Sequence, residues 1–113
     1  MASNPTSRRQ FVDSIIPFLE KYDFDGLDVD WYVNLGIIYQ STFHTARLHC
    51  FFFKFRREYP TARGGKPEDK EGFSLLVQEL REVLSPKGYL LTAAVSPNIE
   101  TVAEGYDVPV LAE

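Results

Sequence analysis

The hydrophobic positions near the N-terminus recur every three or four residues, which is the spacing of one face of an α-helix. They are Phe11, Ile15, Phe18 and Leu19. Thr6 or Ser7 offers the side-chain oxygen that an N-cap requires, so the pattern predicts a helix over residues 7–22. A short segment of alternating apolar and polar residues follows at 24–31, and its length and period predict a β-strand.

The second half of the chain repeats this order of helix and strand. Pro67, Glu68 and Asp69 are typical of a first helical turn, where proline fits the backbone and acidic side chains complement the helix dipole. The stripe expected to be buried consists of Phe73, Leu76, Val77, Leu80, Val83 and Leu84. Residues 89–95 are almost all apolar, which favours a parallel strand covered on both faces, and residues 98–105 suit a short helix.

The order helix, strand, helix, strand is typical of an α/β fold with a parallel sheet. Residues 32–57 stand outside this order, because their hydrophobic positions follow neither the helical nor the strand period. We therefore expect no regular structure there. In folds of this kind, functional side chains lie where strands end and loops begin.

Composition narrows the possible functions. The 113 residues are enough for one small domain, and a net charge of −4 argues against a nucleic-acid partner. A single cysteine, Cys50, excludes an internal disulfide framework. The sequence contains neither the apolar region of a signal peptide nor a stretch of roughly 20 apolar residues, so we expect no signal peptide in this chain and no membrane partner.

The predicted strand at 24–31 carries three carboxylates within six residues, in the run Asp25-Gly-Leu-Asp28-Val-Asp30-Trp31. Because side chains alternate faces along a strand, Asp28 and Asp30 point the same way, and so would residue 32. Neighbouring like charges on a strand are unfavourable unless they share protons, form ion pairs or do chemistry. A solvated loop would also tolerate them, but the apolar residues between the aspartates argue against a loop.

This run resembles the fourth-strand signature of glycoside hydrolase family 18, the chitinases and their relatives, which reads D-G-x-D-x-D-W-E followed by Tyr-Pro. Residues 11–22 resemble the helix before the signature, residues 58–73 the loop and helix after it, and residues 91–96 the fifth strand. The likeness is to animal chitinases and covers 1–31 and 58–113. It implies a partial (β/α)8 TIM barrel of about two strand-helix units, a fragment of the family's catalytic domain.

The resemblance also implies an activity, the hydrolysis of β-1,4-linked N-acetylglucosamine polymers. In this family the acetamido group of the sugar attacks in a substrate-assisted retaining reaction, so neither a protein nucleophile nor a cofactor is expected. Glu58 would be the general acid, Asp30 would orient the acetamido group, and Asp28 would hold a proton shared with Asp30. The remaining assignments are Tyr59 for substrate binding and Asp25, Gly26 and Trp31 for support of the motif.

The implied partner is chitin or a chitooligosaccharide, with no obligate protein partner, and the location of the parent family is extracellular. The motif, however, is interrupted. Tyr32 stands where the family has its glutamate, and Glu58-Tyr59-Pro60 follows only after residues 32–57. A phenol, with a pKa of about 10, is a poor general acid at neutral pH. We therefore expect the polypeptide as given to be inactive.

Residues 32–57 have the features of translated non-coding sequence. Codons compatible with Trp31-Tyr32 contain the GT that begins an intron, and Arg57 as AGG would supply the closing AG. Phe51-Phe52-Phe53 implies a pyrimidine-rich tract shortly before that position. We interpret the segment as a retained intron, a hypothesis that the coding DNA would settle.

Other interpretations stay open. The chain could derive from a family member that binds carbohydrate without cleaving it, as lectins or growth factors do, although such members typically replace the glutamate in place. It could also be a pseudogene product without activity. His44, His49 and Cys50 include metal-binding residue types, but their spacing makes the side chains diverge, so we expect no metal site.

Overall fold

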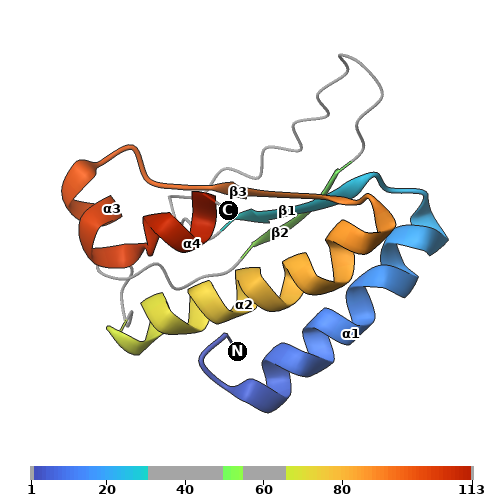
Figure 1. The fold of residues 1–113 in the computed structure, drawn as a ribbon, viewed down its shortest axis with the longest axis horizontal. Helices are drawn as coiled ribbons and strands as arrows, with labels where there is room; N and C mark the ends of the chain where they lie inside the picture. The colour runs from blue at the N-terminus through green and yellow to red at the C-terminus, as the bar shows by residue number, and fades with distance from the viewer. Residues whose placement is uncertain (1, 31–49, 55–65, 113) are drawn as a thin grey trace.

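The computed structural model describes residues 2–30, 50–54 and 66–112, which form a three-stranded sheet with helices packed on one face (Figure 1). In chain order the elements are α1 (Pro5–Tyr22), β1 (Gly26–Asp30), β2 (Cys50–Lys54), α2 (Glu68–Leu84), the 3-10 helix η1 (Ser85–Lys87), β3 (Leu90–Ala94), α3 (Ile99–Gly105) and α4 (Val108–Ala112). The strand order is β2-β1-β3, and both neighbouring pairs are parallel. The predicted α/β fold with a parallel sheet is confirmed.

Helix α1 begins two residues earlier than the pattern predicted. The side chain of Asn4 accepts a hydrogen bond of 3.0 Å from the backbone N–H of Ser7, so Asn4 is the N-cap, and the assignment of Thr6 or Ser7 was wrong. Pro5 fits the first turn, because the N–H that it lacks has no partner inside the helix there. Asp23, with a φ of 56°, ends the helix and leads the chain toward β1.

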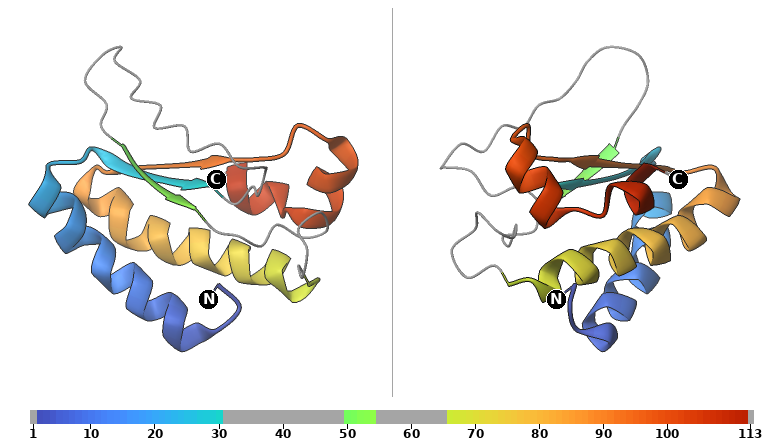
Figure 2. Two further views of the ribbon diagram at one scale, coloured as in Figure 1. Left: turned by 180° about the vertical axis from the view of Figure 1, so that it is seen from behind. Right: turned by 60° about the vertical axis from the view of Figure 1, so that its left-hand side comes forward.

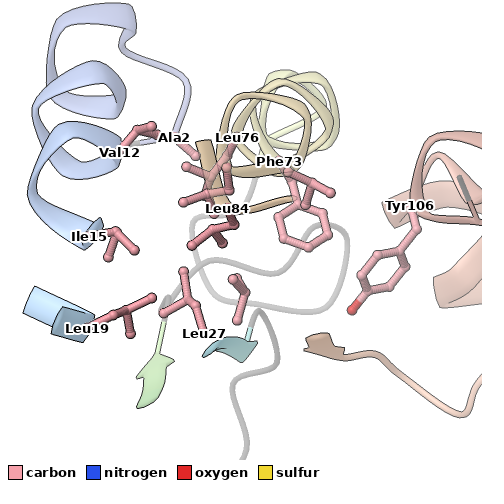
Figure 3. Packing of buried hydrophobic residues seen from close by; sticks show 12 residues of the cluster. Ala2, Val12, Ile15, Leu19, Leu27, Phe73, Leu76, Leu84 and Tyr106 are labelled. Atoms are coloured by element: carbon pink, nitrogen blue, oxygen red, sulfur yellow. The ribbon is translucent and has the colours of Figure 1, made fainter. Parts of the chain in front are cut away.

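The core lies between the sheet and the two long helices, which run side by side (Figures 2 and 3). Leu27 and Val29 of β1 are fully buried on the face that meets the helices. Their cluster includes Val12, Ile15 and Leu19 of α1, and Phe73, Leu76, Leu80 and Leu84 of α2. Each such side chain contributes about 1.5–3 kcal/mol through burial. This burial decides which face of β1 turns toward the helices, and it sends Asp28 to the opposite face.

Strand β2 corrects the expectation that residues 32–57 have no regular structure. Cys50–Lys54 pairs in parallel with β1, from Gly26 opposite Cys50 to Asp30 opposite Lys54. The three consecutive phenylalanines favour an extended backbone, and the edge of β1 offers unpaired N–H and C=O groups to any strand that reaches it. The rest of this segment, including Tyr32, His44 and His49, lies outside the described residues.

Strand β3 corrects a second expectation, because it is not covered on both faces. Leu90 is 41% exposed, Val95 just beyond the strand is 49% exposed, and Leu91 is half-buried. Within the described part of the chain, β3 is an edge of the sheet, and helices pack on one face only. An apolar run of this kind is typical of a strand covered on both faces, and the described residues cover β3 on one face only.

Two short helices follow β3. The predicted helix at 98–105 is confirmed as α3, with Asn98 as N-cap accepting a hydrogen bond of 3.0 Å from the N–H of Thr101. Helix α4 was not predicted. Its single turn is closed by the N–H of Leu111 donating to the carbonyl of Asp107 at 3.1 Å, and one turn is too short to give a hydrophobic period.

Candidate functional site

The two aspartates of β1 lie near the C-terminal end of the central strand of the sheet. Asp28 is opposite Phe52 of β2 and Thr92 of β3, and Asp30 is opposite Lys54 and Ala94. Leu27 and Val29 are buried against the helices, so the side chain of Asp28, which alternates with them along the strand, lies on the face away from α1 and α2. In a parallel barrel with its helices outside, this face is the interior.

Gly26 brings β3 close to this strand. A Cβ atom added at Gly26 would lie 2.3 Å from the carbonyl oxygen of Leu90 and 2.7 Å from its Cβ atom, well inside contact distance. The N–H of Leu90 also donates to the carbonyl of Asp25 at 3.0 Å. The second position of the motif must therefore be glycine for β1 and β3 to pair as they do.

Thr92 is the residue that meets the first of these carboxylates. Its hydroxyl donates a hydrogen bond of 2.5 Å to Oδ1 of Asp28, which is half-buried. Sequence reasoning missed Thr92. The signal that could have found it is that Thr92 is the single residue with a polar side chain in the apolar stretch 90–95, on a strand expected beside the aspartates.

Of the other predicted site residues, some lie within the described part of the chain and some lie outside it. Asp25 lies in the exposed turn before β1, and the backbone of Asp30 ends that strand. The remaining predicted residues, Trp31, Glu58 and Tyr59, lie outside the described residues. The described part of the site thus consists of Asp28, Thr92 and the strand positions around them.

A cavity of about 620 Å³ lies between β3 and helices α2, α3 and α4, and its lining includes Val29 of β1 and Thr92, the hydrogen-bond partner of Asp28. Its lining is mostly apolar, with Val77, Leu91 and Leu111 among the residues. Arg81, also at this cavity, donates to the carbonyl of Val110 at 2.8 Å. Among its described lining residues there is no carboxylate, the group that would supply the acid for glycosidic cleavage.

Two further observations concern the described residues alone. Among residues 2–30, 50–54 and 66–112, no three His, Cys, Asp or Glu side chains gather as metal ligands would. The helices in these same ranges include none with the length and apolarity to cross a membrane.

The fold and the motif together define the class of protein. Parallel strands with helices on one face, and the carboxylate of Asp28 on the other, form an arc of a (β/α)8 barrel. The sequence matches the model of glycosyl hydrolases family 18 over residues 1–113, and the chain belongs to that family.

Curated relatives agree with this assignment. The chain is 37% identical over 108 residues to probable chitinase 2 of Drosophila melanogaster, a match that covers 96% of this chain and 17% of that protein. It is 38% identical over 117 residues to the endochitinase of Manduca sexta, covering 100% and 16% of the two chains. The chain thus spans about a sixth of the length of these relatives.

Solved structures give the same result. The Group IV chitinase of Ostrinia furnacalis, in complex with allosamidin, superposes with a TM-score of 0.69 at 33% identity, covering 99% of this chain and 24% of that one. Catalytic domain 2 of the Group II chitinase from the same organism gives a TM-score of 0.70 at 34% identity, covering 98% and 24%. The fold predicted from the resemblance, part of a TIM barrel, is confirmed.

Proposed function

We propose that this chain is a segment of a chitinase catalytic domain, which hydrolyses β-1,4-linked N-acetylglucosamine polymers. The observation that carries the proposal is the placement of Asp28 on the helix-free face of the central strand, in a chain of family 18. A relative of this chain supports the substrate class. The structure of a mutant of the Group II domain from Ostrinia furnacalis was solved with a penta-N-acetylchitooctaose ligand.

Three carboxyl groups do the chemistry in this proposal. Glu58 protonates the oxygen of the leaving sugar, while the acetamido oxygen of the substrate forms a bond to the anomeric carbon and the glycosidic bond breaks. Asp30 holds the acetamido group in line and balances its developing charge. Asp28 shares a proton with Asp30, because two carboxylates so close together cannot both be ionised. Water then opens the intermediate, with Glu58 now acting as the base, and the configuration is retained. Tyr59 contacts the substrate beside Glu58.

The proposal requires Glu58 to follow Trp31 directly. With residues 32–57 absent, Glu58 would be two positions beyond Asp30 on the same strand, and alternate positions share a face. The active form of the protein therefore lacks residues 32–57, and the polypeptide as given does not cleave chitin. A retained intron is the origin that we propose for the segment.

The topology of the sheet supports the absence of this segment from the active form. In a (β/α)8 barrel each strand lies between its predecessor and its successor in the chain. Strand β3 is the successor of β1, reached through α2. The other edge of β1 belongs to the strand that precedes α1, yet β2 occupies it here. Strand β2 and a closed barrel therefore compete for one edge.

A non-catalytic carbohydrate-binding protein is the second candidate. It is favoured by one finding, that the chain is also 27% identical to chitinase-like protein Idgf4 of Drosophila melanogaster. The motif weighs against it, because Glu58-Tyr59-Pro60 is intact beyond the interruption. In both cases an extracellular location follows from the substrate.

The test compares the intact catalytic domain, expressed from the complete gene, with and without residues 32–57. We expect the form without the segment to cleave a chitooligosaccharide and the form with it to be inactive. Glu58→Gln in the active form should lower the rate by about 10²–10⁴ and leave binding largely intact, because the amide keeps the shape of the acid but has no proton to give. Binding without cleavage in the form lacking the segment would favour the second candidate.

A further inference from the structure

The hydrogen bond between Thr92 and Asp28 joins the strand of the aspartates to its neighbour. The two residues are register partners in adjacent parallel strands, so their side chains lie on the same face. Of the β3 residues on that face, Leu90, Thr92 and Ala94, Thr92 alone carries a hydrogen-bonding side chain. The contact of 2.5 Å therefore depends on one residue of β3.

The bond has a direct consequence for the orientation of Asp28. A free aspartate rotates about two side-chain bonds, whereas a carboxylate held at Oδ1 has one fixed oxygen and leaves Oδ2 for its other neighbours. Thr92 is well suited to hold it, because a β-branched side chain in a strand has little freedom at χ1. Asp28 is half-buried, so water competes only in part for the same oxygen.

We infer that Thr92 is a positioning residue for glycoside hydrolysis, acting through Asp28. It holds Oδ1 of Asp28 and leaves Oδ2 for the proton that, under the proposed function, Asp28 shares with Asp30. This inference deepens the proposed function and rests on it, since it assigns the residue that aligns the proton-sharing pair. It adds a contribution of β3 to a site whose motif lies on β1 and the residues directly before and after it.

A purely structural role is the rival explanation. In that case Thr92 would only balance the charge of Asp28 and help to pair the strands. Loss of the hydroxyl would then lower thermal stability and leave the catalytic rate constant of the remaining folded enzyme unchanged. A positioning role predicts the opposite division, because misplacing a reacting group by about 1 Å can lower a rate roughly a hundredfold.

The experiment uses the intact catalytic domain lacking residues 32–57, with a fluorogenic chitooligosaccharide as substrate. Thr92→Val keeps the shape and removes the donor, and we expect it to lower kcat by roughly ten- to a hundredfold, with KM within about twofold. Thr92→Ser keeps the donor and should retain most of the activity. Thr6→Val makes the same chemical change in the exposed first turn of α1 and should leave kcat unchanged.

A double variant shows whether Thr92 acts through Asp28. Asp28→Ala removes the acceptor, so adding Thr92→Val to it should lower kcat no further. Additive losses in the two variants, or a kcat for Thr92→Val within twofold of the parent, would overturn the inference. A lower melting temperature for Thr92→Val with normal kcat would do the same. If instead the parent enzyme itself hydrolyses nothing and Glu58→Gln changes nothing, the proposed function has failed.

Discussion

At the scale of single residues, close approach between backbones governs the site as much as charge does. Gly26 allows β1 and β3 to come so near that an added Cβ would lie 2.3 Å from the carbonyl oxygen of Leu90. Backbone atoms cannot rotate away as the end of a flexible side chain can, so relief would have to come from movement of a whole strand. Thr92 lies two residues further along that strand and would move with it.

Gly26→Ala should therefore affect stability and activity together. In the intact domain lacking residues 32–57 we expect it to lower the free energy of unfolding by about 1–3 kcal/mol, and to lower kcat as Thr92 withdraws from Asp28. Gly72→Ala is the matched comparison. An added Cβ there would lie 2.9 Å from the backbone nitrogen of Ser3, in the N-terminal segment rather than in β3, so any loss of stability should leave kcat unchanged. Denaturant unfolding and kcat check both variants, and equal losses in the two would contradict this account.

The arrangement of the residues around the aspartates could be predicted from the sequence only in part. Alternation along a strand was enough to predict the face of Asp28, opposite to that of Leu27 and Val29, because that period is local. Thr92 was not predictable from any local period. Its partner depends on the register between strands 60 and more residues apart in the sequence, and that register is set by packing of the core and by Gly26.

At the scale of elements, helices were predicted well because their pattern is local, and strand pairing was predicted poorly because it depends on distant parts of the chain. The buried stripes of α1 and α2 repeat within each helix, so they can be read from the sequence directly. The N-cap was missed because Pro5 moves the start of α1 to Asn4. Strand β2 was missed because its pairing depends on an open edge of β1. The residues of the segment 50–54 contain no information about that edge.

The contact that joins α1 to α2 gives a prediction at this scale. Arg8, whose side chain is 8% exposed, donates to Glu79 at 2.8 Å and to the carbonyl of Ala2 at 2.7 Å. Glu79→Ala should lower the free energy of unfolding by about 1–3 kcal/mol, because it leaves the guanidinium buried with one partner fewer. Glu79→Gln keeps an acceptor and should lose less.

The exposed pair Lys87 and Glu20 is the control for that measurement. Its side chains are 50% and 53% exposed, and water screens their attraction. Glu20→Ala should therefore change the free energy of unfolding by less than about 1 kcal/mol. Denaturant unfolding of both variants in the intact domain tests the contrast, which would be refuted if the exposed pair contributed as much as the buried one.

At the scale of the whole molecule, the described strands form an open sheet with apolar residues along its outer edge. Leu90 and Val95 are exposed, and the apolar cavity of about 620 Å³ lies against the same strand. Exposed apolar surface of this kind is unfavourable in water, and an unpaired edge strand invites association. The complete barrel that we propose for the active protein would cover both.

The isolated 113-residue chain should accordingly be poorly stable. We expect a broad thermal transition and binding of a hydrophobic dye, because β3 is apolar on both sides and covered on one. The intact domain without residues 32–57 is the comparison, and it should melt sharply and bind little dye. A sharp transition of the monomeric 113-residue chain without dye binding would contradict the expectation.

The competition for the edge of β1 can be tested by cross-linking in the intact domain that retains residues 32–57. Asp28 and Phe52 are register partners on neighbouring strands, so cysteines at both positions, with Cys50 replaced by serine, should form a disulfide. Cysteines at Phe52 and Thr92 are the control. Both positions pair with Asp28 from opposite sides, which separates them by about 9.6 Å, and Cα atoms more than about 7 Å apart are not bridged.

If β2 occupies the edge, the first pair cross-links and the second does not, and the strand before α1 is displaced from the sheet. That displacement would prevent the barrel from closing. Under the proposed function the segment would then inactivate the enzyme in two ways, by separating Glu58 from Asp30 and by taking the place of a neighbouring strand. A first pair that stays reduced under oxidising conditions would show that the barrel strand wins the edge. Separation of Glu58 from the aspartates would then be the whole reason for the loss of activity.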